Sequence, residues 1–153
     1  MSNGLETMLA YASAFEETYK DDDWTRLAQY FSDDAVYEVR GGPLACELTG
    51  HDAIFNGLKK SLDGLDRQCD KRHIDVLGQP EITTSGDGEQ IALDWRVRYG
   101  LGDRPEAGFK GRSIVQVSNG LITHLCDEYT DEEMDQFGAW IAEHQLPLDG
   151  SYV

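Results

Sequence analysis

Apolar residues recur at helical spacing in four segments of the chain. The repeat predicts an amphipathic helix over residues 5–19, a shorter helix over residues 24–31 and a third over residues 51–65, each with one face on the core. Near the end of the chain, Thr130 and Glu133 form a capping box that predicts a last helix. The helices therefore lie mainly before and after a region with a different pattern.

Alternating apolar and polar residues elsewhere in the chain predict strands. The predicted strands cover residues 35–39, 70–83, 89–101, 109–118 and 121–129, with a short strand or loop over 44–48. Glycine-containing turns such as Asn119-Gly120 separate the long segments, so these should form an antiparallel meander. Helices on one face of such a sheet make an α+β domain, and its curvature leaves a pocket lined by every second side chain.

The composition limits the possible partners and cofactors. With 153 residues, 40% of them hydrophobic, the chain should form one domain over residues 1–153. Its net charge of −16 argues against nucleic acid as a partner, and no apolar run is long enough to imply a membrane. Three unpaired cysteines and the lack of an export signal favour a cytoplasmic protein. The histidines show no zinc-type spacing, so we expect no metal and no cofactor.

Asp127 is the strongest candidate for chemistry. It alternates with Leu125 and Tyr129 in the last predicted strand, so it faces the core if they do. Burial would raise the pKa of its carboxyl and suit it to act as a general base. The alternative is a hydrated carboxyl near the end of the strand. Tyr37, on the first strand, could orient a substrate through its hydroxyl or simply pack its ring in the core.

Several segments resemble one known superfamily. The stretch from Gln29 to Tyr37 is similar to the helix-to-strand signature of nuclear transport factor 2 (NTF2), ketosteroid isomerase, SnoaL-type polyketide cyclases and limonene-1,2-epoxide hydrolase. The spacing of the hydrolase branch is matched by Gly120, Ile122, Thr123 and Asp127, and residues 146–150 resemble its tail. This resemblance implies a cone-shaped, NTF2-like α+β fold, in which helices pack on the concave face of a curved, mostly antiparallel sheet.

The hydrolase template implies catalytic roles. In that family the aspartate matching Asp127 activates water beside a tyrosine matching Tyr37, and an arginine links it to a second aspartate. One register of the strand over residues 89–101 supplies Asp94 and Arg96 for this pair in swapped order, which makes them catalytic candidates.

A register shifted by one residue would turn the opposite face of that strand inward. Ordinary burial favours this shift, because an apolar face is formed by Ile91, Leu93, Trp95, Val97 and Tyr99. A dimer contact could cover the apolar face instead, leaving the charged pair inside. The pocket is therefore apolar in one register and charged in the other.

The other branches match only in part. The base of ketosteroid isomerase corresponds to Val39 and its oxyanion tyrosine to Phe15, which argues against steroid isomerisation of that type. The cyclases use an aspartate and histidines in a hydrophobic cavity, parts that Asp127 and His73 could play.

A small hydrophobic molecule is the expected ligand. The residues predicted to bind it are Trp95, Phe15, Tyr129, Phe109 and His73. The sequence predicts a cofactor-independent enzyme of the epoxide hydrolase, isomerase or cyclase type, forming a homodimer through the outer face of its sheet. The alternatives are a ligand-binding protein without chemistry and a protein-interaction domain of the NTF2 type.

Overall fold

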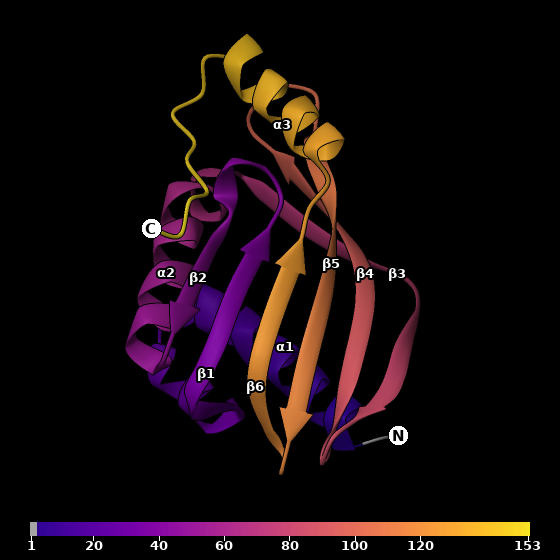
Figure 1. Ribbon diagram of the computed structural model, residues 1–153. Coiled ribbons are helices and arrows are strands. Elements are labelled where there is room, and N and C mark those ends of the chain that lie inside the picture. Colours follow the sequence, from indigo (N-terminus) through magenta and orange to yellow (C-terminus); the bar gives the residue numbers. More distant parts are fainter. Residues whose placement is uncertain (1–2) are drawn as a thin grey trace.

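Figure 1 shows the computed structural model of the protein, which describes residues 3–153. The helices and 3₁₀ helices are α1 (Asn3–Asp21), η1 (Trp24–Tyr30), η2 (Gly42–Leu44), α2 (His51–Gly64), η3 (Asp66–Gln68) and α3 (Asp131–Glu143). The strands are β1 (Phe31–Arg40), β2 (Cys46–Thr49), β3 (Lys71–Ser85), β4 (Gly88–Gly100), β5 (Ala107–Ser118) and β6 (Leu121–Glu128).

The described strands form one six-stranded sheet in the order β2-β1-β6-β5-β4-β3. β1 runs parallel to β6, and the other neighbouring strands are antiparallel. The predicted meander is confirmed, since β3 to β6 pair in sequence order. Asn119 and Gly120, with φ angles of 53° and 77°, make the tight turn between β5 and β6.

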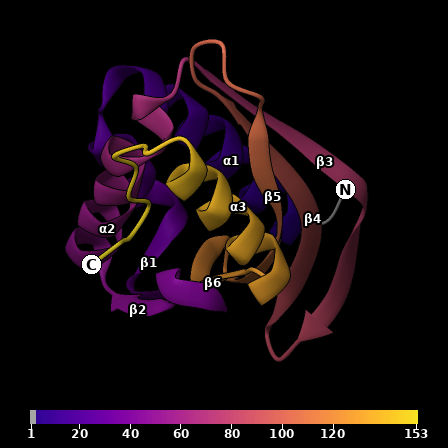
Figure 2. The ribbon, with the colours of Figure 1, turned by 90° about the horizontal axis from the view of Figure 1, so that it is seen from above.

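Helices cover one face of the curved sheet. Figures 1 and 2 show α1 and α2 against that face, while α3 crosses one end of the sheet. This arrangement confirms the predicted α+β fold with a mostly antiparallel sheet. Thr130 accepts a hydrogen bond from the backbone N–H of Glu133 (3.3 Å), as its place in a capping box predicts. Within residues 3–153, no helix has the length and apolar character needed to cross a membrane.

Three segments correct or complete the predicted elements. Residues 24–30 form the 3₁₀ helix η1 rather than an α-helix, with Asp23 as its N-cap and the extended Phe31 at its end. β1 begins at Phe31 rather than at residue 35, and a bulge between Phe31 and Val36 interrupts its pairing with β6. Residues 46–49, left open between strand and loop, form β2 by pairing with β1.

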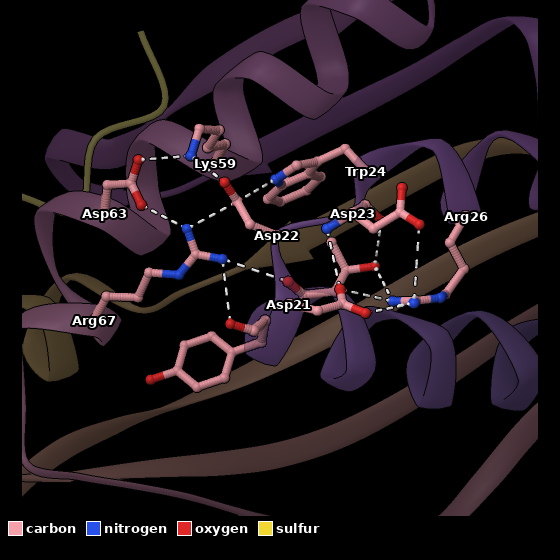
Figure 3. Close-up of polar contacts among 10 residues, drawn as sticks. Asp21, Asp22, Asp23, Trp24, Arg26, Lys59, Asp63 and Arg67 are labelled. Carbon is pink, nitrogen blue, oxygen red and sulfur yellow. Dashed lines mark hydrogen bonds and ion pairs between the residues drawn. The ribbon is translucent and has the colours of Figure 1, made fainter.

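A cluster of charged side chains joins the end of α1 to α2 and the η3 segment (Figure 3). Asp22 leaves the helix with a left-handed backbone (φ 61°). Its carboxylate accepts hydrogen bonds from Trp24 Nε1 (2.7 Å), Lys59 Nζ (2.8 Å) and Arg67 Nη1 (3.0 Å). The bond from Lys59 is the main reason that the pKa of Asp22 is lowered. The cluster therefore links the two helices that cover the sheet.

Candidate active site

The register of β4 decides the character of the site. Ile91, Leu93, Val97 and Tyr99 are buried and Trp95 is half-buried, whereas Asp94 is exposed. The apolar face of β4 therefore points inward, because side chains alternate between the two faces of a strand. The favoured apolar register is the one that the structure contains.

The charged candidates lie outside the cavity. Asp94 pairs with Arg112 on the neighbouring strand (2.9 Å), Arg96 lies 3.7 Å from Glu133 of α3, and neither Asp94 nor Arg96 lines the cavity. Their positions correct the expectation that Asp94 and Arg96 lie beside Asp127. The alternation along β4 that turns Trp95 inward turns these two residues away.

His73 also lies outside. Its side chain is 60% exposed and contacts Asp75 at 2.8 Å, on the opposite face of β3 from the residues that line the cavity. The structure therefore gives no support to a ligand contact through His73.

A cavity of about 270 Å³ lies between the sheet and helices α1 and α2. Four of the five residues predicted to bind a ligand line this cavity: Phe15, Trp95, Phe109 and Tyr129. The rings of Trp95, Phe109 and Tyr129 pack against one another, with ring centroids of Trp95 and Tyr129 5.9 Å apart and those of Phe109 and Tyr129 5.2 Å apart. Such a cavity suits a small, largely apolar molecule.

Asp127 and Tyr37 meet in this cavity, although 90 residues separate them. The Tyr37 hydroxyl donates a hydrogen bond to Asp127 Oδ2 (2.7 Å). Ser113 Oγ lies 2.6 Å from Asp127 Oδ1 and accepts a bond from Trp95 Nε1 (2.9 Å). Because an indole N–H can only donate, the hydrogen of Ser113 is free to point at the carboxyl. Asp127 is thus held by two hydroxyl groups.

Burial raises the pKa of Asp127, and the hydrogen bonds from Ser113 and Tyr37 oppose that rise. Both partners are neutral, and among residues 3–153 no basic side chain forms an ion pair with Asp127. The carboxyl faces a mostly apolar cavity, where its charged form loses the solvation of water. Asp127 is half-buried and faces the cavity, and the group is suited to exchange a proton.

The C-terminal tail closes one side of the cavity. Gly150 and Tyr152 line it, and the Tyr152 ring lies 5.5 Å from that of Tyr37. Burial raises the pKa of Tyr152 to about 12, so its hydroxyl keeps its proton near neutral pH. The tail is attached to α2, because Ser61 Oγ donates to Gly150 O (2.6 Å) and Asp149 N donates to Gly64 O (2.9 Å).

Sequence reasoning did not identify Ser113 or Tyr152 as site residues. Ser113 shares its strand face with buried Val115, a signal that could have placed it inside. No periodic signal marks Tyr152, because it lies in an irregular segment whose position depends on docking against α2.

The fold and the site together define an α+β protein with a half-buried carboxyl in an apolar cavity. The sequence matches the model of the SnoaL-like domain over residues 12–125. The chain therefore belongs to the SnoaL-like domain family. No curated protein matches its sequence significantly.

Solved structures show the same fold at low sequence identity. TerC, co-crystallised with polyporic acid, is 16% identical with a TM-score of 0.63, over 92% of this chain and 99% of that one. A candidate polyketide cyclase from Xanthomonas campestris pv. campestris is 17% identical with a TM-score of 0.54, over 92% and 99%. A hypothetical protein with a ketosteroid isomerase-like fold from Catenulispora acidiphila, in complex with trimethylamine, is 16% identical with a TM-score of 0.55, over 90% and 93%. The chain thus has the fold of these structures, which is the NTF2-like fold.

The raised pKa of Asp127 predicts a pH-dependent effect on stability. The folded protein keeps a proton that the unfolded chain loses at lower pH, so stability falls as the pH rises from the unfolded to the folded pKa. Asp127→Asn cannot ionise, and its amide can still bond to Ser113 and Tyr37. The variant should gain stability over the wild type as pH rises, by about 1.4 kcal/mol for each unit by which the pKa is raised.

Urea unfolding of both proteins over a pH series that starts near the ordinary carboxyl pKa and ends above neutrality measures this difference. The same pH dependence in both proteins would contradict a raised pKa for Asp127.

Proposed function

We propose that the protein is an enzyme of the isomerase or cyclase type, which moves a proton at a carbon beside a carbonyl group of a small hydrophobic molecule. One observation carries this proposal: Asp127 lies in an apolar cavity, contacts only neutral donors and has a raised pKa. A carboxylate in such a place is a stronger base than one in water. Membership of a family whose structural relatives include a candidate polyketide cyclase supports the same reaction class.

The proposed reaction begins at Asp127. Its carboxylate removes a proton from the carbon next to the carbonyl, and the electron pair of the broken C–H bond moves onto the carbonyl oxygen to form an enolate. Tyr37 holds the carboxylate in position, and the protonated Tyr152 hydroxyl beside it is the proposed donor to the enolate oxygen. Return of the proton to a different carbon completes an isomerisation. Attack of the enolate carbon on a second carbonyl closes a ring, and the Asp127 proton then neutralises the new alkoxide.

Epoxide hydrolysis receives less support. The hydrolase template needs a second acid close to Asp127, whereas Asp94 lies on the outer face of the sheet in a pair with Arg112. Ser113, the cross-strand neighbour of Asp127, is a weak acid that cannot take the place of a carboxylic acid.

Incubation of the protein in heavy water with a panel of cyclic ketones, diketones and limonene-1,2-epoxide tests the proposal. Mass spectrometry would measure deuterium gained next to the carbonyl and diol formed from the epoxide. We expect deuterium exchange in at least one ketone and no diol. Diol without exchange would favour the hydrolase, and tight binding without either product would favour a protein that only holds its ligand.

Tyr37→Phe is expected to slow the exchange by about tenfold and to change its pH dependence. The lost hydrogen bond lowers the pKa of Asp127 in the wild type, so its removal raises that pKa further. The acid limb of the pH–rate profile, along which the base loses its proton, should therefore move to higher pH. A slower reaction with an unmoved profile would assign Tyr37 to packing alone.

The homodimer predicted from the sequence remains a proposal. The outer face of the sheet, through which it would form, is less apolar than expected. The outer sheet face carries the ion pairs Arg98–Asp75 (3.3 Å) and Arg112–Asp94 (2.9 Å). Light scattering at several protein concentrations measures the oligomeric state, and an unchanged monomer mass would contradict the dimer.

A further inference from the structure

A second polar group lies in the wall of the same cavity, away from Asp127. Arg72 Nε donates to Asp66 Oδ2 (2.6 Å), and Arg72 Nη1 donates to both carboxylate oxygens of Glu16 (3.1 and 2.8 Å). Tyr99 also donates to Asp66 Oδ2 (3.1 Å), and the Arg72 guanidinium stacks over the Tyr19 ring at 4.6 Å. These contacts hold the guanidinium in one orientation.

One end of this guanidinium has donors without a protein partner. Arginine carries five N–H groups, and the bonds from Nε and Nη1 use three of them. Among residues 3–153, no hydrogen bond from Nη2 is formed, although the side chain is only 10% exposed and lines the cavity. Nη2 is accessible rather than sealed in the core, so its two N–H groups can bond to water or to an acceptor from within the cavity.

The charge of the lining excludes an anionic acceptor. The charged residues that line the cavity are Glu16, Asp66, Arg72 and Asp127, three acids and one base. Even with both buried acids protonated, Glu16 balances Arg72. A carboxylate would therefore meet no net positive charge and would lose its hydration. A neutral carbonyl, ether or hydroxyl oxygen can accept the bond without that cost.

The position of Arg72 also sets the length of the ligand. Arg72 lies on β3 and Asp127 on β6, three strands away across the sheet. At a strand spacing of about 4.8 Å, their backbones are separated by roughly 14 Å in that direction alone. Ile74 and Val76, on the same face of β3 as Arg72, line the cavity and are 39% and 61% exposed, so they form an apolar mouth.

We propose that the cavity binds an elongated, neutral, mostly apolar molecule with oxygen functions at both ends, one reached by Asp127 and the other hydrogen-bonded to Arg72 Nη2. This inference rests on the proposed function, since it names the substrate class of the same site. It requires no catalytic step. Its test is therefore an equilibrium binding measurement in Asp127→Asn, where proton transfer at Asp127 is absent.

Three probes separate the contributions: phenylcyclohexanone, the isomers of methoxyphenylcyclohexanone and the isomers of carboxyphenylcyclohexanone. Calorimetry would give the dissociation constant of each probe. One methoxy isomer should bind about tenfold more tightly than the unsubstituted ketone, the gain expected from one hydrogen bond to a charged donor. The carboxylates should bind more weakly than the unsubstituted ketone.

Arg72→Lys is the decisive variant. Lysine keeps the positive charge between Asp66 and Glu16 but has no second nitrogen to offer the cavity. The methoxy isomer and the unsubstituted ketone should then bind with about equal affinity, because the Nη2 donor is gone. Glu16→Gln is the matched control, since it leaves Nη2 in place. It should keep the preference and improve binding of the carboxylates.

Two results would overturn the inference. One is a preference for the methoxy isomer that survives in Arg72→Lys, and the other is the absence of any preference in the parent protein, as expected if Nη2 only binds water. If near-UV circular dichroism shows that Arg72→Lys is unfolded, Asp66→Asn combined with Arg72→Met removes the ion pair and the donor together, because methionine has no N–H group. A lack of deuterium exchange would contradict the proposed function without changing these affinities.

Discussion

Asp127→Asn is expected to lower the rate of deuterium exchange into a ketone substrate by about 10²- to 10⁴-fold, the range attributed to a general base. Asparagine has nearly the shape of aspartate and can bond to Ser113 and Tyr37, but it cannot accept a proton from carbon. The affinity for the ketone should change little, because the loss concerns the transition state. Exchange measured by mass spectrometry, together with calorimetric binding, separates the two effects.

Asp94→Asn is the matched control for this experiment. The substitution is chemically identical, but Asp94 lies on the outer sheet face and its exposed pair with Arg112 contributes little to stability. Its exchange rate should equal that of the wild type. If the exchange rate fell greatly in Asp94→Asn but not in Asp127→Asn, Asp94 rather than Asp127 would be the reacting group, as in the charged register of β4.

Gly64→Ala is expected to displace the C-terminal tail and open the cavity. A Cβ atom at Gly64 would lie 1.9 Å from the backbone oxygen of Asp149, which flexible side chains cannot relieve. The tail must therefore move, and with it Gly150 and Tyr152, which line the cavity. We expect a stability loss of about 1–3 kcal/mol, typical of overpacking, and an exchange rate lower by at least about tenfold.

Gly138→Ala provides the control for the tail experiment. Gly138 is exposed in α3, and no atom lies within 4 Å of a Cβ built there. The same substitution should raise stability by about 0.5–1 kcal/mol, through the lower entropy of the unfolded chain. Urea unfolding and carboxypeptidase digestion of the tail measure both variants. If Gly64→Ala resists digestion and catalyses exchange at the wild-type rate, the tail is not part of the site.

The two polar groups of the cavity have different physical roles. Asp127 has only neutral partners, which leaves its proton affinity high and its proton available. Asp66 is buried as well, but the ion pair with Arg72 and the bond from Tyr99 work against the rise that burial causes in its pKa. Asp66 therefore orients the guanidinium, and Asp127 is the group left to exchange a proton.

Local patterns in the sequence determined much of this structure. Alternation separated an apolar face of β4 from a charged one, and the apolar face, which ordinary burial favoured, is the one that turns inward. The Asn119-Gly120 turn and the Thr130 cap could also be predicted from the sequence, since each depends on the conformational preferences of a few adjacent residues.

Tertiary structure alone decided the partners of Asp127. Ser118 pairs with Leu121 at the turn, and continuing that register along the hairpin would place Arg112 opposite Asp127. A shift between Gln116 and Val117 leaves Thr123 as an extra residue on β6 and brings Ser113 opposite instead. Asp127 therefore has a neutral hydrogen-bond partner across the strands in place of a cation. A cation would lower the pKa of its carboxyl, whereas burial beside neutral partners raises it. Neither this bulge nor the docking of Tyr152 against Tyr37 follows from neighbouring residues, because both depend on packing between segments distant in the chain.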